Sequence, residues 1–89
     1  MKAQIYSYND WIEETDPKKL FNTYDSKLKK AGFNVIEYQE KMFEPYGYTG
    51  LWLLGESHFA VHTFPEENRT YIELASCTLE KYVNFVKDL

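Results

Sequence analysis

The chain has 89 residues, enough for one domain over residues 1–89 with one modest core and too few for two. Its composition, 44% hydrophobic and 18% aromatic, excludes a disordered chain, because so many apolar side chains can bury a core. Acidic residues outnumber basic ones, the net charge is −4, and the basic residues cluster only at Lys27, Lys29 and Lys30. This distribution argues against a nucleic-acid-binding surface, which needs a basic stripe.

No apolar run is long enough for a signal peptide or a membrane span; the longest, residues 51–54, is far too short. We therefore expect a cytoplasmic protein with no membrane partner. Cys77 is the single cysteine, so the chain can form no internal disulfide and has no paired-cysteine zinc or redox motif. The sequence also lacks a glycine-rich phosphate loop and an HExxH motif, and it predicts no metal site.

The first part of the chain predicts a short strand and then a helix. Residues 5–8 indicate a short strand, and a polar stretch follows over residues 9–16. Asp16 can cap a helix and Pro17 suits its first position, while apolar residues then recur at helical spacing. The predicted helix covers residues 17–31 and ends before a glycine.

Four further strands are predicted, over residues 35–43, 48–55, 58–64 and 70–77. In the first of them, Ile36, Tyr38 and Met42 would share one face. The second is apolar on both faces at residues 51–54, as expected for a strand with both sides covered. Residues 44–47 form a turn, and the polar loop 65–69 joins the last two strands into a hairpin.

A final helix begins after Thr78, a suitable cap. Its predicted buried stripe comprises Leu79, Tyr82, Val83, Val86 and Leu89. The element order β-α-β-β-β-β-α, with short strand connections, implies an α+β two-layer sandwich: an antiparallel sheet with two helices on one face. Aromatic and apolar residues on the uncovered face would need a partner, which predicts a homodimer.

Residues 55–66 contain the densest group of chemically active side chains. Alternation along a strand places His58 and His62 on one face and Phe59 on the other. The hairpin brings Cys77 back to the neighbourhood of Ser57, and its register, or a bulge, decides whether Cys77 shares the face of His62. Taken alone, these residues also fit a structural role, because strand histidines and single cysteines usually belong to the packing.

Three separated blocks together resemble the small bacterial and archaeal-type S-adenosylmethionine decarboxylases. The blocks are FEPYGYTG at residues 43–50, ESHFAVHTFPE at residues 56–66, and Cys77. They are similar to the family pattern F-x-P-x-G-x-S-G, E-S-H-x-x-x-H-T-W-P-E and a Thr-Cys-Gly that ends the next strand, at matching spacing. The resemblance is close over residues 43–77 and extends to the order of elements elsewhere.

The resemblance implies a proenzyme that cuts its own backbone between Glu56 and Ser57. The Ser57 hydroxyl would attack the Glu56 carbonyl, and β-elimination of the resulting ester would leave a pyruvoyl group at residue 57. The family's processing histidine falls on His62 and its proton-donor cysteine on Cys77. The pyruvoyl cofactor forms a Schiff base with the substrate amine and accepts the electrons left when CO₂ departs.

The implied substrate is S-adenosylmethionine, decarboxylated to supply the aminopropyl donor for spermidine in polyamine biosynthesis. The family's adenine-stacking aromatic matches Phe43, whose ring can also favour a nearby sulfonium. The full set of implied substrate-binding residues is Phe43, Thr49, Phe59 and Glu66.

The chain departs from the family pattern at Thr49, Phe64, Glu73, Ser76 and Thr78, where serine, tryptophan, aspartate, threonine and glycine are usual. Two alternatives follow. The substrate could be another amino acid, such as ornithine or arginine, because substrate-facing positions have changed. The chain could instead be a non-processed relative that acts as a binding or regulatory subunit; Thr78 favours this reading, and the intact Ser57, His62 and Cys77 oppose it.

Overall fold

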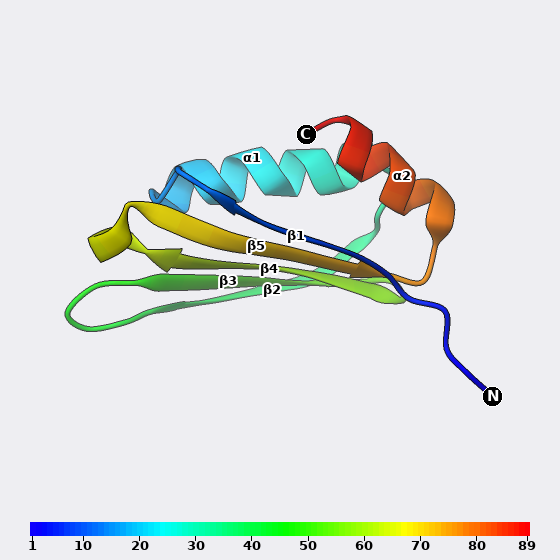
Figure 1. The fold of residues 1–89 in the computed structure, drawn as a ribbon, viewed down its shortest axis with the longest axis horizontal. Coiled ribbons are helices and arrows are strands. Elements are labelled where there is room, and N and C mark those ends of the chain that lie inside the picture. Colours follow the sequence, from blue (N-terminus) through cyan, green and yellow to red (C-terminus); the bar gives the residue numbers. More distant parts are fainter.

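The structure, a computed structural model, describes residues 1–89. Its strands are β1 (Tyr6–Ile12), β2 (Val35–Met42), β3 (Tyr48–Leu54), β4 (Ser57–Phe64) and β5 (Arg69–Ser76). The helices are α1 (Pro17–Lys30) and α2 (Leu79–Lys87), and a short 3-10 turn, η1 (Pro65–Glu67), joins β4 to β5. All strands are antiparallel neighbours in the order β1-β5-β4-β3-β2, and both helices lie on the same side of the sheet (Figure 1). The predicted α+β two-layer sandwich is confirmed.

The core lies between the helices and one face of the sheet. Asp16 caps α1 by accepting a hydrogen bond from the backbone N–H of Lys19 at 3.0 Å. The buried residues of α1, spaced by four, are Leu20, Tyr24 and Leu28. They pack with Trp52 and Phe59, which are fully buried, because even positions of β3 and odd positions of β4 point toward the helices.

The first strand is longer than the sequence predicts. β1 continues to Ile12 and pairs with β5 along its whole length, from Tyr6 opposite Ser76 to Ile12 opposite Thr70. The expectation of a non-strand polar stretch from residue 9 was therefore wrong. An edge strand with one open face accepts polar side chains, since its backbone bonds to β5 do not depend on them.

Two predicted faces also differ from the structure. In α2 the inward side carries fully buried Phe85 with half-buried Tyr82 and Val86, while Leu79, Val83 and Leu89 are exposed. This short helix contacts the core along one line of i, i+3 and i+4 positions, so the wider predicted stripe was wrong. In β2 a register shift between Val35 and Glu37 leaves Ile36 exposed, which separates it from the face of Tyr38.

The second face of the sheet, here called the open face, carries no helix (Figure 1). Leu51 and Leu53 point to it and are 43% and 49% exposed, and Trp11 and Phe64 on the same face are also exposed. Within one chain only one face of residues 51–54 is covered, and cover of the other face by a second copy stays a prediction. No helix is both long and apolar enough to cross a membrane.

Candidate active site: two regions at opposite ends of β4

A cleft of about 260 Å³ opens at the end of the sheet where β2 turns into β3 and β4 runs into η1. Its lining includes Phe43, Thr49, His62 and Glu66, which come from two separated stretches of the chain, residues 43–49 and 62–66. The sequence identified each of these residues as a candidate for substrate binding or processing. We call this region the cleft end; in Figure 1 it is the left end of the sheet.

The turn between β2 and β3 shapes one wall of the cleft. The backbone N–H of Phe43 donates to the carbonyl of Gly47 at 2.9 Å, and Gly47 has a φ of 118°, which favours glycine. On the adjoining strand, the N–H of Tyr48 donates to the buried Thr63 Oγ1 at 2.9 Å. The turn therefore presents the Phe43 ring, 49% exposed, beside the cleft.

His62 projects from the open face and is half-buried. Its neighbour on β3 is Thr49, whose Oγ1 lies 3.0 Å from His62 Nδ1 at hydrogen-bonding distance. Its neighbour on β5 is Tyr71, whose ring is nearly parallel to the imidazole, with centroids 6.3 Å apart. The imidazole therefore has a polar contact on one flank and an aromatic one on the other.

The second region, the turn end, surrounds the peptide bond between Glu56 and Ser57. Gly55 and Glu56 form a two-residue turn between β3 and β4, because Leu54 pairs directly with Ser57. Glu56 has a φ of 64°, in the left-handed region that L side chains rarely adopt. Backbone strain is thus placed at the residue that precedes Ser57.

The Ser57 side chain is buried on the helix-covered side of β4. Its Oγ donates to Ser76 Oγ at 3.2 Å, and Ser76 Oγ in turn donates to the carbonyl of Thr78 at 3.0 Å. Ser57 also pairs with Ser76 in the sheet, so exposed Cys77 comes one residue beyond this pair. The predicted approach of Cys77 to Ser57 through the hairpin is confirmed.

The two regions do not form one site within a single chain. His62 lies five residues after Ser57 on the same strand, which puts the two side chains on opposite faces of the sheet. The residues are also separated by about 16 Å along the strand, at about 3.3 Å per residue. Phe59, which the family resemblance places in the substrate site, is fully buried against the helices and does not line the cleft.

Three tyrosines on the helix-covered side of the sheet have a pKa above the usual value. Burial raises the pKa of Tyr48, whose hydroxyl bonds to that of Tyr38 on the covered face. Burial is also the main cause that raises the pKa of Tyr24, with smaller contributions from the charges of Tyr8 and Asp10. For Tyr8 burial again leads, followed by its hydrogen bond to Asp10. These groups stay protonated and belong to the core side of the sheet.

Sequence reasoning missed two residues near His62. Tyr46 lines the cleft from the tip of the β2–β3 turn, and Tyr71 contacts the imidazole from β5. Tyr71 could have been found only with the register of the hairpin, which pairs it with His62. No group of three or more His, Cys, Asp or Glu side chains is placed to bind a metal ion.

The fold of the chain matches that of a solved structure. A solved structure of the adenosylmethionine decarboxylase from Aquifex aeolicus superposes on this chain with a TM-score of 0.76 over 98% of this chain and 78% of that one. The two sequences are 21% identical, so this likeness establishes the fold alone.

The sequence pattern of the family described as S-adenosylmethionine decarboxylase matches residues 5–88. The chain therefore belongs to the S-adenosylmethionine decarboxylase family.

Curated relatives share this family. The S-adenosylmethionine decarboxylase proenzyme of Prochlorococcus marinus is 35% identical over 68 residues, covering 76% of this chain and 54% of its own length. That of Hydrogenobaculum is 32% identical over 77 residues, covering 84% and 55%. S-adenosylmethionine decarboxylase proenzyme 2 of Bacillus cereus is 45% identical over 47 residues, covering 53% and 38%. The chain spans about half the length of these relatives, or less.

Proposed function

We propose that this chain is a self-processing, pyruvoyl-dependent decarboxylase of S-adenosylmethionine, cleaved between Glu56 and Ser57. The observation that carries the proposal is the left-handed backbone of Glu56, directly before the serine that matches the family's cleavage position. A non-glycine residue in this conformation costs about 1–2 kcal/mol, and breaking the peptide bond releases the constraint. The relatives named above as proenzymes support the same reading.

The bonds that change in the cleavage all lie at the turn end, and the reaction also needs a base and one water. Ser57 Oγ attacks the Glu56 carbonyl carbon, and the bond from that carbon to the Ser57 nitrogen breaks, which leaves an ester and a free amine. A base then removes the Ser57 Cα proton, a Cα–Cβ double bond forms, and the bond between Cβ and Oγ breaks, which releases Glu56 as a carboxylate. Water converts the remaining enamine into a pyruvoyl group and ammonia.

The surroundings of Ser57 fit such a group. Ser57 is 8% exposed and its side chain contacts the buried hydroxyl of Ser76, so the pyruvoyl methyl, which the Ser57 Cβ would become, would lie in the same buried surroundings. When present, the pyruvoyl group supplies a carbonyl that binds the substrate amine and accepts the electron pair left by CO₂. Cys77, exposed one residue beyond the Ser57–Ser76 pair, would return a proton to the substrate carbon.

The cleft end provides recognition of the nucleoside. The half-exposed Phe43 ring offers a stacking face for adenine and a favourable surface for the sulfonium cation. Glu66 and Thr49 line the same cleft and can accept hydrogen bonds from the ribose hydroxyls. The decarboxylated product would be the aminopropyl donor for spermidine synthesis.

Within one chain these two regions lie apart, and we propose that a homodimer brings them together across the open face. The face exposes Leu51, Leu53, Trp11 and Phe64, and a second copy would bury them. A two-fold axis that lies between the two sheets and across their strands would set the turn end of one copy over the cleft end of the other. The partner's His62 would then approach the Glu56–Ser57 bond.

Intact-protein mass spectrometry tests the cleavage. Purified wild-type protein should resolve into residues 1–56 and 57–89, with the second fragment blocked to Edman degradation, whereas Ser57→Ala should stay whole. If the wild-type chain stays intact after long incubation and has no carbonyl that reacts with hydroxylamine, the non-processed binding subunit becomes the better account. Turnover measured on S-adenosylmethionine, ornithine and arginine then identifies the substrate.

Mixing two inactive variants tests the homodimer. His62→Ala retains Ser57, and Ser57→Ala retains His62, so neither should cleave alone. Co-expressed, they should form mixed dimers in which the His62→Ala chain is cut, because its partner supplies the imidazole. Cleavage of His62→Ala on its own, or none in the mixture, would contradict a role for His62 across the interface.

A further inference from the structure

A row of side chains crosses the open face at the level of His62. The sheet register pairs Thr49 on β3 with His62 on β4, His62 with Tyr71 on β5, and Tyr71 with Trp11 on β1. Directly paired residues of neighbouring strands have their Cβ atoms about 5 Å apart, close enough for each side chain to contact the next. The row thus places the imidazole between a hydroxyl and a phenol ring.

The two contacts of His62 restrain different motions. Thr49 Oγ1 lies 3.0 Å from Nδ1 and fixes the direction of that ring atom. The Tyr71 ring lies 28° from the imidazole plane with centroids 6.3 Å apart, within the range of aromatic contacts, and restricts tilting of the imidazole toward β5. Thr49 is a single contact at one edge of the ring, so it does not by itself prevent that tilt.

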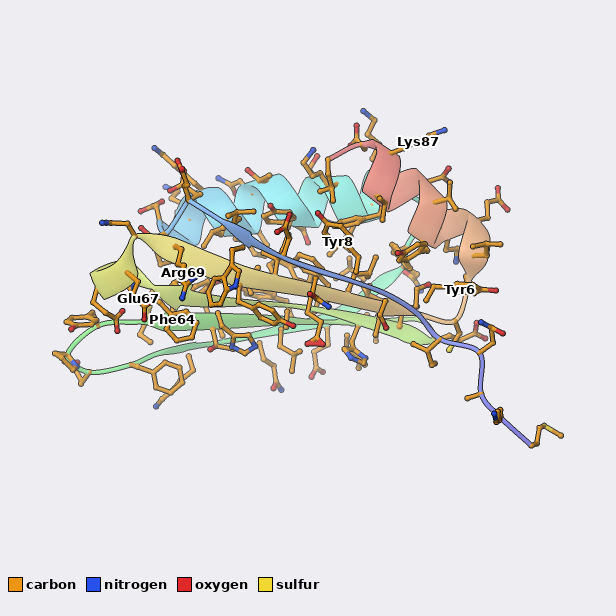
Figure 2. The ribbon with its side chains drawn as sticks, in the orientation of Figure 1. Tyr6, Tyr8, Phe64, Glu67, Arg69 and Lys87 are labelled. Carbon is orange, nitrogen blue, oxygen red and sulfur yellow. The ribbon has the colours of Figure 1, made fainter.

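Tyr71 is itself supported on its far side. The Trp11 ring packs against it edge-on, with centroids 5.6 Å apart and planes at 64°. The guanidinium of Arg69 lies 3.7 Å from the centre of the Trp11 ring, and Arg69 pairs with Glu67 at 2.8 Å. Figure 2 shows Phe64, Glu67 and Arg69 together at this end of the sheet, and Phe64 completes the packing against Trp11 at 5.7 Å.

We propose that Tyr71 is a positioning residue for His62. Trp11 packs against the side of Tyr71 that faces away from His62, and Arg69 packs on Trp11. A histidine side chain has two rotatable bonds, and contacts on both flanks restrict its ring to one orientation. The significance of this for cleavage rests on the proposed function of His62; the positioning itself does not.

Proton NMR of the His62 ring in Tyr71→Ala tests the proposal, with Ser57→Ala as background so that every sample is one intact chain. In the parent, the ring protons should show a Tyr71 ring-current shift and a nuclear Overhauser contact to the Thr49 methyl group. Tyr71→Ala should lose the shift and weaken the Thr49 contact, while Tyr71→Phe, which retains the ring, should keep both. An unchanged Thr49 contact in Tyr71→Ala would overturn the proposal.

Tyr6→Ala is the matched control. It removes a tyrosine from another aromatic pair, Tyr6 with Tyr82 at 5.9 Å, at the far end of β1. It should leave the His62 signals unchanged, and a change there would mean that the signals report general loosening of the sheet, which also overturns the proposal. If Tyr71→Ala does not fold, Tyr71→Val, with a side chain suited to strands, makes the same test.

A second measurement uses the chain with Ser57 intact. Tyr71→Ala should slow appearance of the 57–89 fragment by about tenfold, since small misplacement of a reacting group has effects of up to a hundredfold. Tyr71→Phe should restore the rate. If wild type is not cleaved at all, the proposed function fails, and the NMR comparison still decides the role of Tyr71.

Discussion

The side chains at the two ends of β4 differ in size and in exposure. At the turn end, small hydroxyl side chains such as Ser57 and Ser76 are buried and bonded to each other, beside a backbone residue in a rare conformation. At the cleft end, large side chains such as Phe43 remain half-exposed around an open cleft. The first end suits bond breaking at one fixed atom, and the second suits recognition of a flat ligand.

The distance between these ends shows that a compact sequence motif need not form a compact site. Ser57 and His62 belong to one short motif, yet a strand separates them by its length and turns them to opposite faces. A second copy over the open face can place the imidazole of its own cleft end near the turn end of the first. The following predictions test this division of roles.

The largest effect is expected from removing the thiol at the turn end. Cys77→Ala should be cleaved normally, because the proposed cleavage uses Ser57. Its kcat for formation of the correctly protonated product should fall by a factor of about 10²–10⁴. Fragment masses and product analysis measure the two steps separately. Cys77→Ser serves as the size-matched control, and loss of cleavage in Cys77→Ala would show that the thiol has another role.

A change at the cleft end should have the complementary phenotype. Phe43→Ala should raise KM by about tenfold and leave kcat and cleavage nearly unchanged, because one stacking contact is worth about 0.5–1.5 kcal/mol. Its half-exposed position predicts a change in unfolding free energy within about 0.5 kcal/mol. Phe43→Tyr should behave like wild type. A fall in kcat with constant KM would place Phe43 in the chemical step and break the division.

A substitution that relieves the backbone strain at Glu56 tests whether this strain contributes to cleavage at the turn end. On the Ser57→Ala background, Glu56→Gly should raise the free energy of unfolding by about 1 kcal/mol, because glycine adopts positive φ freely. With Ser57 intact, the same change should slow cleavage. Gly55→Ala is the control, since an added Cβ there would meet no atom within 4 Å. Faster cleavage in Glu56→Gly would exclude strain as a contributor.

The smallest effect concerns the core that both ends share. Burial raises the pKa of Tyr24 in the folded chain, so the unfolded chain loses this proton first as the pH rises. The stabilisation is complete below about pH 10 and is lost above it. Tyr24→Phe should therefore reduce the alkaline loss of stability in urea titrations. Equal alkaline curves for wild type and Tyr24→Phe would contradict this.

Local patterns predicted most of the fold. The Asp16 cap and the spacing of Leu20, Tyr24 and Leu28 identified α1, and the polar loop after Phe64 identified the β4–β5 hairpin. The predicted extent of β1 and the predicted buried face of α2 were wrong. Neighbouring elements set both, because β1 is extended by its pairing with β5 and the contacts of a short helix depend on where it packs.

The sequence by itself determined the element order, the family and the chemical candidates, because caps, alternation and motif spacing are local properties of the chain. Tertiary structure alone decided that Phe43, Thr49, His62 and Glu66 share one cleft while Ser57 faces the helices. It also decided that Tyr71 lies beside His62. These relations depend on the register between strands distant in sequence, and the physical reason is that a shift of one residue reverses every side chain's face.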